Sequence, residues 1–184
     1  MNKKTTLYVD DDYEPIRMLF KLRAPSLFMG LLLGLGISLV TSRFEEVLSQ
    51  NIQIAFFLPF IVYMADAIGA QTSAIYSRDL RSGNAKFSNY LRKELILGII
   101  FGVIFGIFSG AIALLWLNNN LLALSVAIAT CLAILVAPTV ALLITYMFDI
   151  LHDDPAAYSG PIATVMQDMT SVLIYGIVSS IIFL

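Results

Sequence analysis

The 184-residue chain is predicted to be an all-α integral membrane protein with five transmembrane helices. Hydrophobic residues make up 59% of the chain and charged residues only 13%, and the mean hydropathy of +0.85 is far above the range of soluble domains. Between Glu94 and Asp149 there is no charged residue at all. A soluble protein of this length cannot bury so much apolar surface.

Five segments are long and apolar enough to cross a bilayer, which takes about 20 mostly apolar residues. They cover residues 24–41, 52–76, 95–117, 121–151 and 162–184. Residues 1–23 are predicted to form a cytoplasmic tail and a short helix on the membrane surface, because apolar and basic side chains are mixed between Tyr13 and Arg23. Residues 24–184 are predicted to form one five-helix transmembrane transport domain.

The second span contains a proline and an acidic residue. Pro59 has no N–H to donate and frees a carbonyl one turn earlier, so we expect the helix to bend there. Asp66 follows about two turns later, near the middle of the bilayer. Its neighbours are small or polar, and they include Gly69 and Gln71.

The third and fourth spans are predicted to form a helical hairpin, because the run of asparagines at residues 118–120 makes a tight polar turn. The third span carries glycines at a strict four-residue spacing, which places them on one helix face: Gly98, Gly102, Gly106 and Gly110. Another helix can approach this face closely, either within the monomer or across a dimer. The fourth span is longer than a membrane requires and contains Pro138, so a tilted or kinked helix is predicted.

The fifth span follows the residues Ser159, Gly160 and Pro161, which are predicted to break the chain immediately before the helix. Asp168 then lies about two turns inside the span. Thr164 is one turn earlier on the same face, so a hydroxyl and a carboxylate would line one stripe.

The positions of the basic residues predict the orientation. Nearly all of them precede the first span or lie between the second and third: Lys3, Lys4, Arg17, Lys21, Arg23, Arg78, Arg81, Lys86, Arg92 and Lys93. Arg43 alone lies between the first and second spans, and no basic residue follows Lys93. The positive-inside rule therefore predicts a cytoplasmic N-terminus, five crossings of the inner (plasma) membrane and an external C-terminus.

Two of the spans contain a charged residue well inside their length, which is Asp66 in the second span and Asp168 in the fifth. Asp149 lies near the end of the fourth span, where that long helix is expected to extend into water. An ionisable side chain at membrane depth costs from about 3 to more than 10 kcal/mol, and neither span holds a lysine or arginine that could neutralise it. A permeating cation is the partner we predict. An alternative stays open, in which each aspartate hydrogen-bonds a neighbouring helix and serves only to stabilise the packing of the helices. The candidate metal-binding residues are Asp168, Asp66, Thr164 and Gln71.

The available ligands favour magnesium as the ion. Transition metals prefer thiolates and imidazoles, and the one thiol at membrane depth is the isolated Cys131. Calcium takes six to eight oxygen ligands, whereas magnesium is commonly held through one or two carboxylates and keeps several waters. The same residues leave open a carrier that couples cation movement to sodium or protons.

Several motifs resemble the MgtE family of magnesium transporters. They are Pro59-Phe-Ile, Gly69-Ala-Gln71, Leu91-Arg-Lys-Glu94-Leu, and the stretch from Asp154 through Ser-Gly-Pro161 to Asp168. The resemblance extends over nearly the whole chain from about residue 15. It implies a homodimer with the ion path between the subunits, lined by the second and fifth spans, and it places Asp168 at the pore aspartate that binds hydrated magnesium.

Two departures accompany the resemblance. Where the family has Gly-Gly-Asn-Val-Gly-Thr-Gln, this chain has the segment from Ala65 to Gln71, in which Ala67 replaces the amide and Asp66 adds a carboxylate one residue earlier. A second ring of negative charge is therefore expected. The cytoplasmic magnesium-sensing domains common in the family are not expected in this chain.

The predicted function is inward transport of hydrated Mg²⁺ by a homodimer with a central pore. The ion is the cargo rather than a resident cofactor. No enzymatic activity is expected, because the sequence has no phosphate-binding glycine loop and no nucleophile–histidine pair. Neither nucleic acid nor a small organic substrate is an expected partner, whereas the lipid bilayer is. The alternatives are the sodium- or proton-coupled carrier and a non-transporting membrane subunit that acts as a scaffold.

Overall fold

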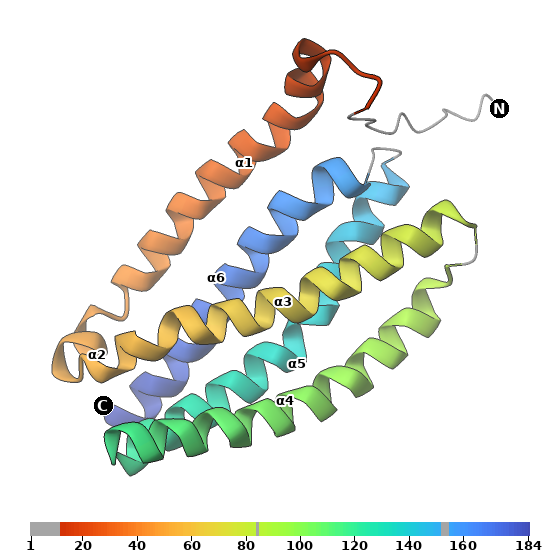
Figure 1. The fold of residues 1–184 in the computed structure, drawn as a ribbon. Helices are drawn as coiled ribbons and strands as arrows, with labels where there is room; N and C mark the ends of the chain where they lie inside the picture. The colour runs from red at the N-terminus through yellow and green to blue at the C-terminus, as the bar shows by residue number, and fades with distance from the viewer. Residues whose placement is uncertain (1–11, 84, 152–154) are drawn as a thin grey trace.

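The computed structural model describes residues 12–83, 85–151 and 155–184, and the regular structure of these residues is helical (Figure 1). The helices are α1 (Ile16–Ser42), α2 (Glu45–Gln50), α3 (Gln53–Arg81), α4 (Phe87–Leu117), α5 (Asn120–Ile150) and α6 (Pro155–Phe183). Five of them are long and apolar enough to cross a membrane. The prediction of an all-α multi-pass membrane protein is therefore confirmed.

Helix α1 is continuous from Ile16 to Ser42, so the boundary drawn between residues 23 and 24 falls inside a helix. Pro25 lies within it, and the hydroxyl of Ser26 donates a hydrogen bond to the carbonyl of Arg23 at 3.0 Å. The membrane-surface position of the first turns stays a prediction. The predicted cytoplasmic tail falls mostly on residues 1–11, which lie outside the described residues.

The short helix α2 was not predicted, because six residues are too few to show a helical period. It is held by apolar contacts with its neighbours. Val47 is fully buried, and the ring of Phe44, just before the helix, packs against Gly176 of α6 so closely that a Cβ there would lie 2.4 Å from the ring. This contact anchors the connection between α1 and α3 to the end of α6.

Helices α4 and α5 form the predicted hairpin, and the glycine face of α4 lies directly on α5. A Cβ added at Gly102 would lie 2.6 Å from the carbonyl oxygen of Cys131, and one added at Gly106 would lie 2.7 Å from that of Ala127. Both distances are shorter than any ordinary van der Waals contact. The close packing predicted for this face therefore occurs within the protomer.

Helix α6 begins at Pro155 and continues through Pro161, so the predicted chain break before the fifth span is wrong. Proline at a first helical position is already set to a helical φ and lacks an N–H that would have no partner there. Pro161, six residues later, still removes one backbone hydrogen bond without ending the helix. Helices α3 and α5 likewise continue through Pro59 and Pro138.

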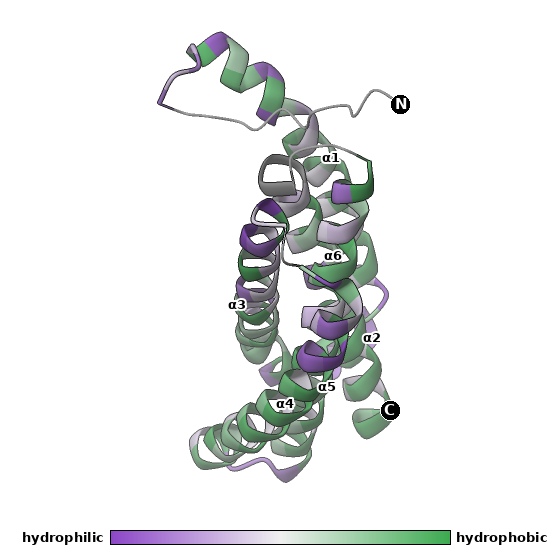
Figure 2. Ribbon diagram, turned by 90° about the vertical axis from the view of Figure 1, so that its right-hand side faces the viewer, coloured by the Kyte–Doolittle hydropathy of each residue, from purple (hydrophilic) through white to green (hydrophobic). Residues whose placement is uncertain are grey.

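Helices α3 and α6 pack against each other and against α5, while α1 lies along the outer side of α6 (Figure 1). The hydroxyl of Tyr175 donates to the carbonyl of Ile54 at 2.9 Å and so links α6 to α3. Two further pairs of hydroxyls join these helices to α5, namely Ser73 with Thr145 at 2.7 Å and Ser125 with Ser179 at 2.9 Å. Figure 2, in which the ribbon is coloured by residue hydropathy, shows hydrophobic residues along most of the length of the helices, as expected of helices that cross a membrane.

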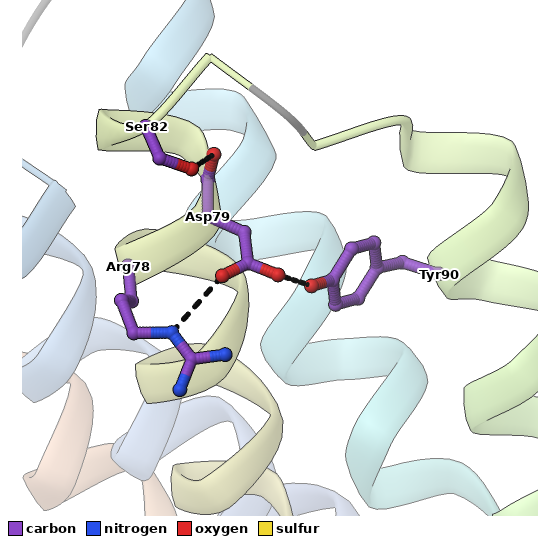
Figure 3. A network of polar contacts seen from close by, with 4 residues as sticks. All are labelled: Arg78, Asp79, Ser82 and Tyr90. Carbon is purple, nitrogen blue, oxygen red and sulfur yellow. Dashed lines mark hydrogen bonds and ion pairs between the residues drawn. The ribbon is translucent and has the colours of Figure 1, made fainter.

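The ends of α3 and α4 are joined by a polar network (Figure 3). The carboxylate of Asp79 accepts hydrogen bonds from Arg78, at 3.0 Å, and from the hydroxyl of Tyr90 on α4. The hydroxyl of Ser82 donates to the backbone carbonyl of Asp79 at 2.9 Å. Arg78 is thus engaged at the end of α3, about 12 residues from Asp66, which corresponds to roughly 18 Å along a helix.

Candidate ion site

Asp66 and Asp168 occupy the same relative position in two helices of equal length. Helices α3 and α6 each have 29 residues, and each aspartate is the fourteenth residue of its helix. Each carboxylate is therefore about 20 Å from either helix end at 1.5 Å per residue. If both helices span a bilayer, the two carboxylates lie near its middle.

The two helices run in opposite directions, so their midpoints meet. Tyr175, late in α6, contacts Ile54, early in α3, and Gln167 contacts Gly69. Asp66 and Asp168 are both half-buried, and their charges interact. Like charges close together repel, so this pair favours a cation between or beside them.

A cavity of about 270 Å³ lies between α3 and α6 on one side of this pair. It extends toward the end of the bundle where α3 finishes and α6 begins. Its lining is formed by small and polar residues: Ala70, Ser73, Ala74, Ser77, Ser159, Gly160, Ala163, Thr164 and Gln167. Asp66 belongs to the same stripe of α3, since Ala70, Ser73 and Ser77 follow it at helical spacing. The cavity therefore leads toward the two aspartates.

Asp168 lies between two faces of α6. On one side Val165 and Met169 lie next to Gly30 and Gly36 of α1, and on the other Thr164 and Gln167 face α3. Asp168 is thus directed at the seam between α1 and α3, and it is not part of the cavity lining. Its half-exposed position at mid-helix leaves it open toward the outside of the protomer.

The four residues proposed from the sequence are therefore not all brought together. Thr164 lines the cavity, one helical turn from Asp168, and Asp66 lies opposite on α3. Gln71 is exposed on a different face of α3 from the cavity. Among the described residues, no three histidine, cysteine or acidic side chains cluster closely enough to hold a metal ion.

Sequence reasoning missed Gln167, which is 2% exposed and packs its carboxamide onto Gly69. A Cβ added at Gly69 would lie 1.5 Å from Oε1 of Gln167, so the carboxamide occupies the space that any other residue would fill. The sequence showed Gly69 as a small neighbour of Asp66, but it did not show which group would pack against this glycine. The signal available in the sequence was a glutamine directly before the aspartate of an apolar span.

Replacement of Gly69 by alanine is expected to destabilise the protein through this contact. The new methyl group must displace the carboxamide of Gln167, which is the flexible end of a side chain beside the cavity, so the cost should lie toward the low end of the about 1–3 kcal/mol typical of overpacking. Gln167→Ala removes the obstructing group, so the double variant should recover part of the loss. Thermal unfolding of the two single variants and the double variant in detergent measures this coupling.

The matched control is Gly34→Ala, because an added Cβ at Gly34 of α1 meets no atom within 4 Å. It should leave the unfolding temperature unchanged or slightly raised, as alanine favours helix. Strictly additive effects of Gly69→Ala and Gln167→Ala would contradict the contact.

A second missed interaction joins α3 to α4. The hydroxyl of Thr72 donates to Glu94 at 2.8 Å and also to the carbonyl of Ile68 at 3.2 Å. Glu94 belongs to one of the motifs that carry the family resemblance, and the hydrogen bond shows its local role, which is to hold the start of α4 beside α3. Asp154, at the start of the last motif, lies outside the described residues.

Comparison with known proteins places the chain in a family. The family model MgtE, described as a divalent cation transporter, matches residues 58–178. The chain is 33% identical over 156 residues to the magnesium transporter MgtE of Enterococcus faecalis and 30% identical over 156 residues to that of Bacillus subtilis. Each alignment covers 83% of this chain. The magnesium transporter MgtE of Thermus thermophilus is 25% identical over 148 residues, or 79% of this chain.

The alignments cover only about a third of each relative, between 33% and 35% of its length. The matched region of this chain contains α4, α5 and most of α3 and α6, with both aspartates. On this evidence the chain belongs to the MgtE family of divalent cation transporters.

Proposed function

We propose that the protein transports Mg²⁺ into the cytoplasm across the plasma membrane. The observation that carries the proposal is the pair of carboxylates at the matched midpoints of α3 and α6, with no basic residue in the middle of either helix. Such a pair at membrane depth is stable when a cation or a water-filled path accompanies it. The names of the relatives, all magnesium transporters, support the choice of ion.

The cavity between α3 and α6 has room for a hydrated ion. Six waters occupy roughly 180 Å³ at about 30 Å³ each, and the cavity measures about 270 Å³. Magnesium gives up its waters reluctantly and is usually bound through one or two carboxylates. The hydroxyl of Thr164 and the carboxylates of Asp66 and Asp168 would then contact the waters of the ion as it passes.

A homodimer completes the path in this proposal. Asp168 is half-exposed at the seam between α1 and α3, where lipid would be an unfavourable neighbour for a carboxylate. A second protomer related by a two-fold axis would cover this seam and bring its own Asp168 across the path. Gln71, exposed on α3, would then face the partner rather than the cavity of its own protomer.

The basic residues give the direction. They lie at the start of α1 and around the connection from α3 to α4, and the positive-inside rule places that end in the cytoplasm. The cavity opens toward the same end. A membrane potential contributes about 2.3 kcal/mol per charge per 100 mV. For a divalent cation at about 100 mV, this energy favours the inside by a concentration ratio of about three orders of magnitude, without any coupled ion.

The test is magnesium flux into liposomes that contain the purified protein, together with growth rescue of a magnesium-auxotrophic cell. Uptake should follow the membrane potential in the absence of sodium and proton gradients. Uptake that requires either gradient would instead favour the coupled carrier. Protein that inserts correctly and conducts no cation would favour a scaffold role and contradict the proposal.

Asp66 is expected to modulate transport. Asp66→Asn keeps the shape of the side chain and removes one of the two negative charges, so the attraction for a divalent ion falls while Asp168 remains. Magnesium flux should fall several-fold and competition by sodium should increase. Flux competition in liposomes measures both effects, and unchanged flux with unchanged selectivity would assign Asp66 to structural packing.

A further inference from the structure

Gln167 holds a buried oxygen without a partner at the inner end of the cavity. The side chain is 2% exposed and lines the cavity, yet its Oε1 has no hydrogen bond. An unsatisfied buried acceptor costs about 1–3 kcal/mol, so its presence in a folded protein requires an explanation. Oδ1 of Asp66 is also buried without a hydrogen-bond partner. Asp66 lies one turn of α3 before Gly69, which is the residue that the Gln167 carboxamide covers. In the described part of the chain, the third such atom is Thr139 Oγ1 on α5.

The unpartnered atoms at this place are all acceptors. An ionised carboxylate accepts and does not donate, and a glutamine oxygen likewise only accepts. Water molecules bound to a cation turn their oxygen atoms to the ion and their O–H groups outward, so a hydrated cation presents donors alone. The oxygens of Gln167, Asp66 and Asp168 therefore match the outer surface of a hydrated cation.

We propose that Gln167 is a specificity-determining residue that accepts a hydrogen bond from the water shell of Mg²⁺ as the ion passes Asp66 and Asp168. This inference rests on the proposed function and deepens it, because it assigns the selection of the hydrated ion to an uncharged side chain. Gly69 makes the arrangement possible, since a side chain at that position would displace the carboxamide.

Calcium provides the contrast. It binds directly to six to eight oxygens in flexible geometry, whereas magnesium keeps several of its waters. A group that contacts only the water shell therefore contributes more to the passage of magnesium than of calcium. Loss of the Gln167 acceptor should lower the ratio of Mg²⁺ to Ca²⁺ flux, rather than lower both fluxes equally.

The experiment compares Gln167→Leu and Gln167→Glu with the wild-type protein in liposomes, with Mg²⁺ and Ca²⁺ uptake measured separately. Leucine keeps the volume and burial and removes the acceptor, so the Mg²⁺/Ca²⁺ ratio should fall about tenfold, the effect of one lost hydrogen bond. Glutamate keeps an acceptor at the same place and should retain the magnesium preference. Gln167→Met replaces the leucine variant if that variant does not purify as a folded protein.

Gln53→Leu is the matched control, because it makes the same chemical change in α3 near the opposite end of the bundle. The side chain of Gln53 accepts a hydrogen bond from Asn119 at 3.2 Å and is remote from the cavity. This variant should leave the flux ratio unchanged even if its stability falls.

An unchanged flux ratio in Gln167→Leu would overturn the inference, and so would an equal loss of both fluxes, which marks a purely structural role. Loss of the preference in Gln167→Glu would overturn it as well. A wild-type protein that carries no magnesium would refute the proposed function itself. If the wild-type protein prefers magnesium and Gln167→Leu prefers it equally, only the role of Gln167 is refuted and the proposed function stands.

Discussion

Asp168→Asn is expected to abolish nearly all magnesium flux while the protein still folds and assembles. Asparagine has the size and hydrogen-bonding reach of aspartate, so the packing of α6 between α1 and α3 is preserved. What disappears is the negative charge at the middle of the helix. In a dimer both copies of this charge are lost. At an effective dielectric constant of about 20, the attraction between each carboxylate and a cation at contact distance amounts to several kcal/mol.

The measurement is potential-driven magnesium uptake in liposomes at matched protein content, with gel filtration and thermal unfolding as tests of folding. Asp149→Asn is the control, since it removes one carboxylate from an exposed position at the end of α5. It should transport close to the wild-type rate. Normal magnesium uptake by Asp168→Asn would refute the proposed mechanism.

Gly102→Leu and Gly106→Leu are expected to prevent assembly of the helical bundle. Even a Cβ at these positions would overlap the backbone of α5, at 2.6 Å from the carbonyl oxygen of Cys131 and 2.7 Å from that of Ala127. Backbone atoms in a helix cannot move aside as a flexible side chain can, so α4 and α5 must separate. The cost should exceed the 1–3 kcal/mol typical of overpacking.

Yield of monodisperse protein in detergent and the unfolding temperature measure this effect. Gly34→Leu is the matched control, because that glycine of α1 has no neighbouring atom within 4 Å of an added Cβ and its surroundings are open. Any Gly102→Leu or Gly106→Leu protein that does fold should keep its ion preference, since the glycine face lies on the side of the bundle remote from the cavity. Normal yield and stability of both variants would show that α4 and α5 do not pack as described.

Much of the fold was predictable because a bilayer allows few solutions. Backbone groups in hydrocarbon require internal hydrogen bonds, so long apolar segments become helices. The five spans and the α4–α5 hairpin are confirmed on this basis. The error at Ser159–Pro161 has a local cause, since a proline that breaks a helix in isolation is tolerated when the helix is packed on its neighbours.

The candidate site was only partly predictable. Asp66 and Asp168 were identified because a charge in an apolar span is rare, and the structure brings their helices together. Their depth along matched helices could not be read from the sequence while α6 was expected to begin seven residues too late. Gln167 escaped attention because an uncharged glutamine carries little signal until the structure shows it buried on Gly69.

The sequence by itself determined the fold class, the number of spans and the two acidic residues, since these depend on hydropathy and charge along one chain. Only the tertiary structure decided that the glycines of α4 meet α5 within the protomer, and that Thr164 and Gln167 share a cavity while Gln71 lies outside it. The physical reason is that helical periodicity shows which residues share a face, but not which neighbour that face will meet. That choice depends on how closely whole helices can pack, and it is made by contacts between residues far apart in the chain.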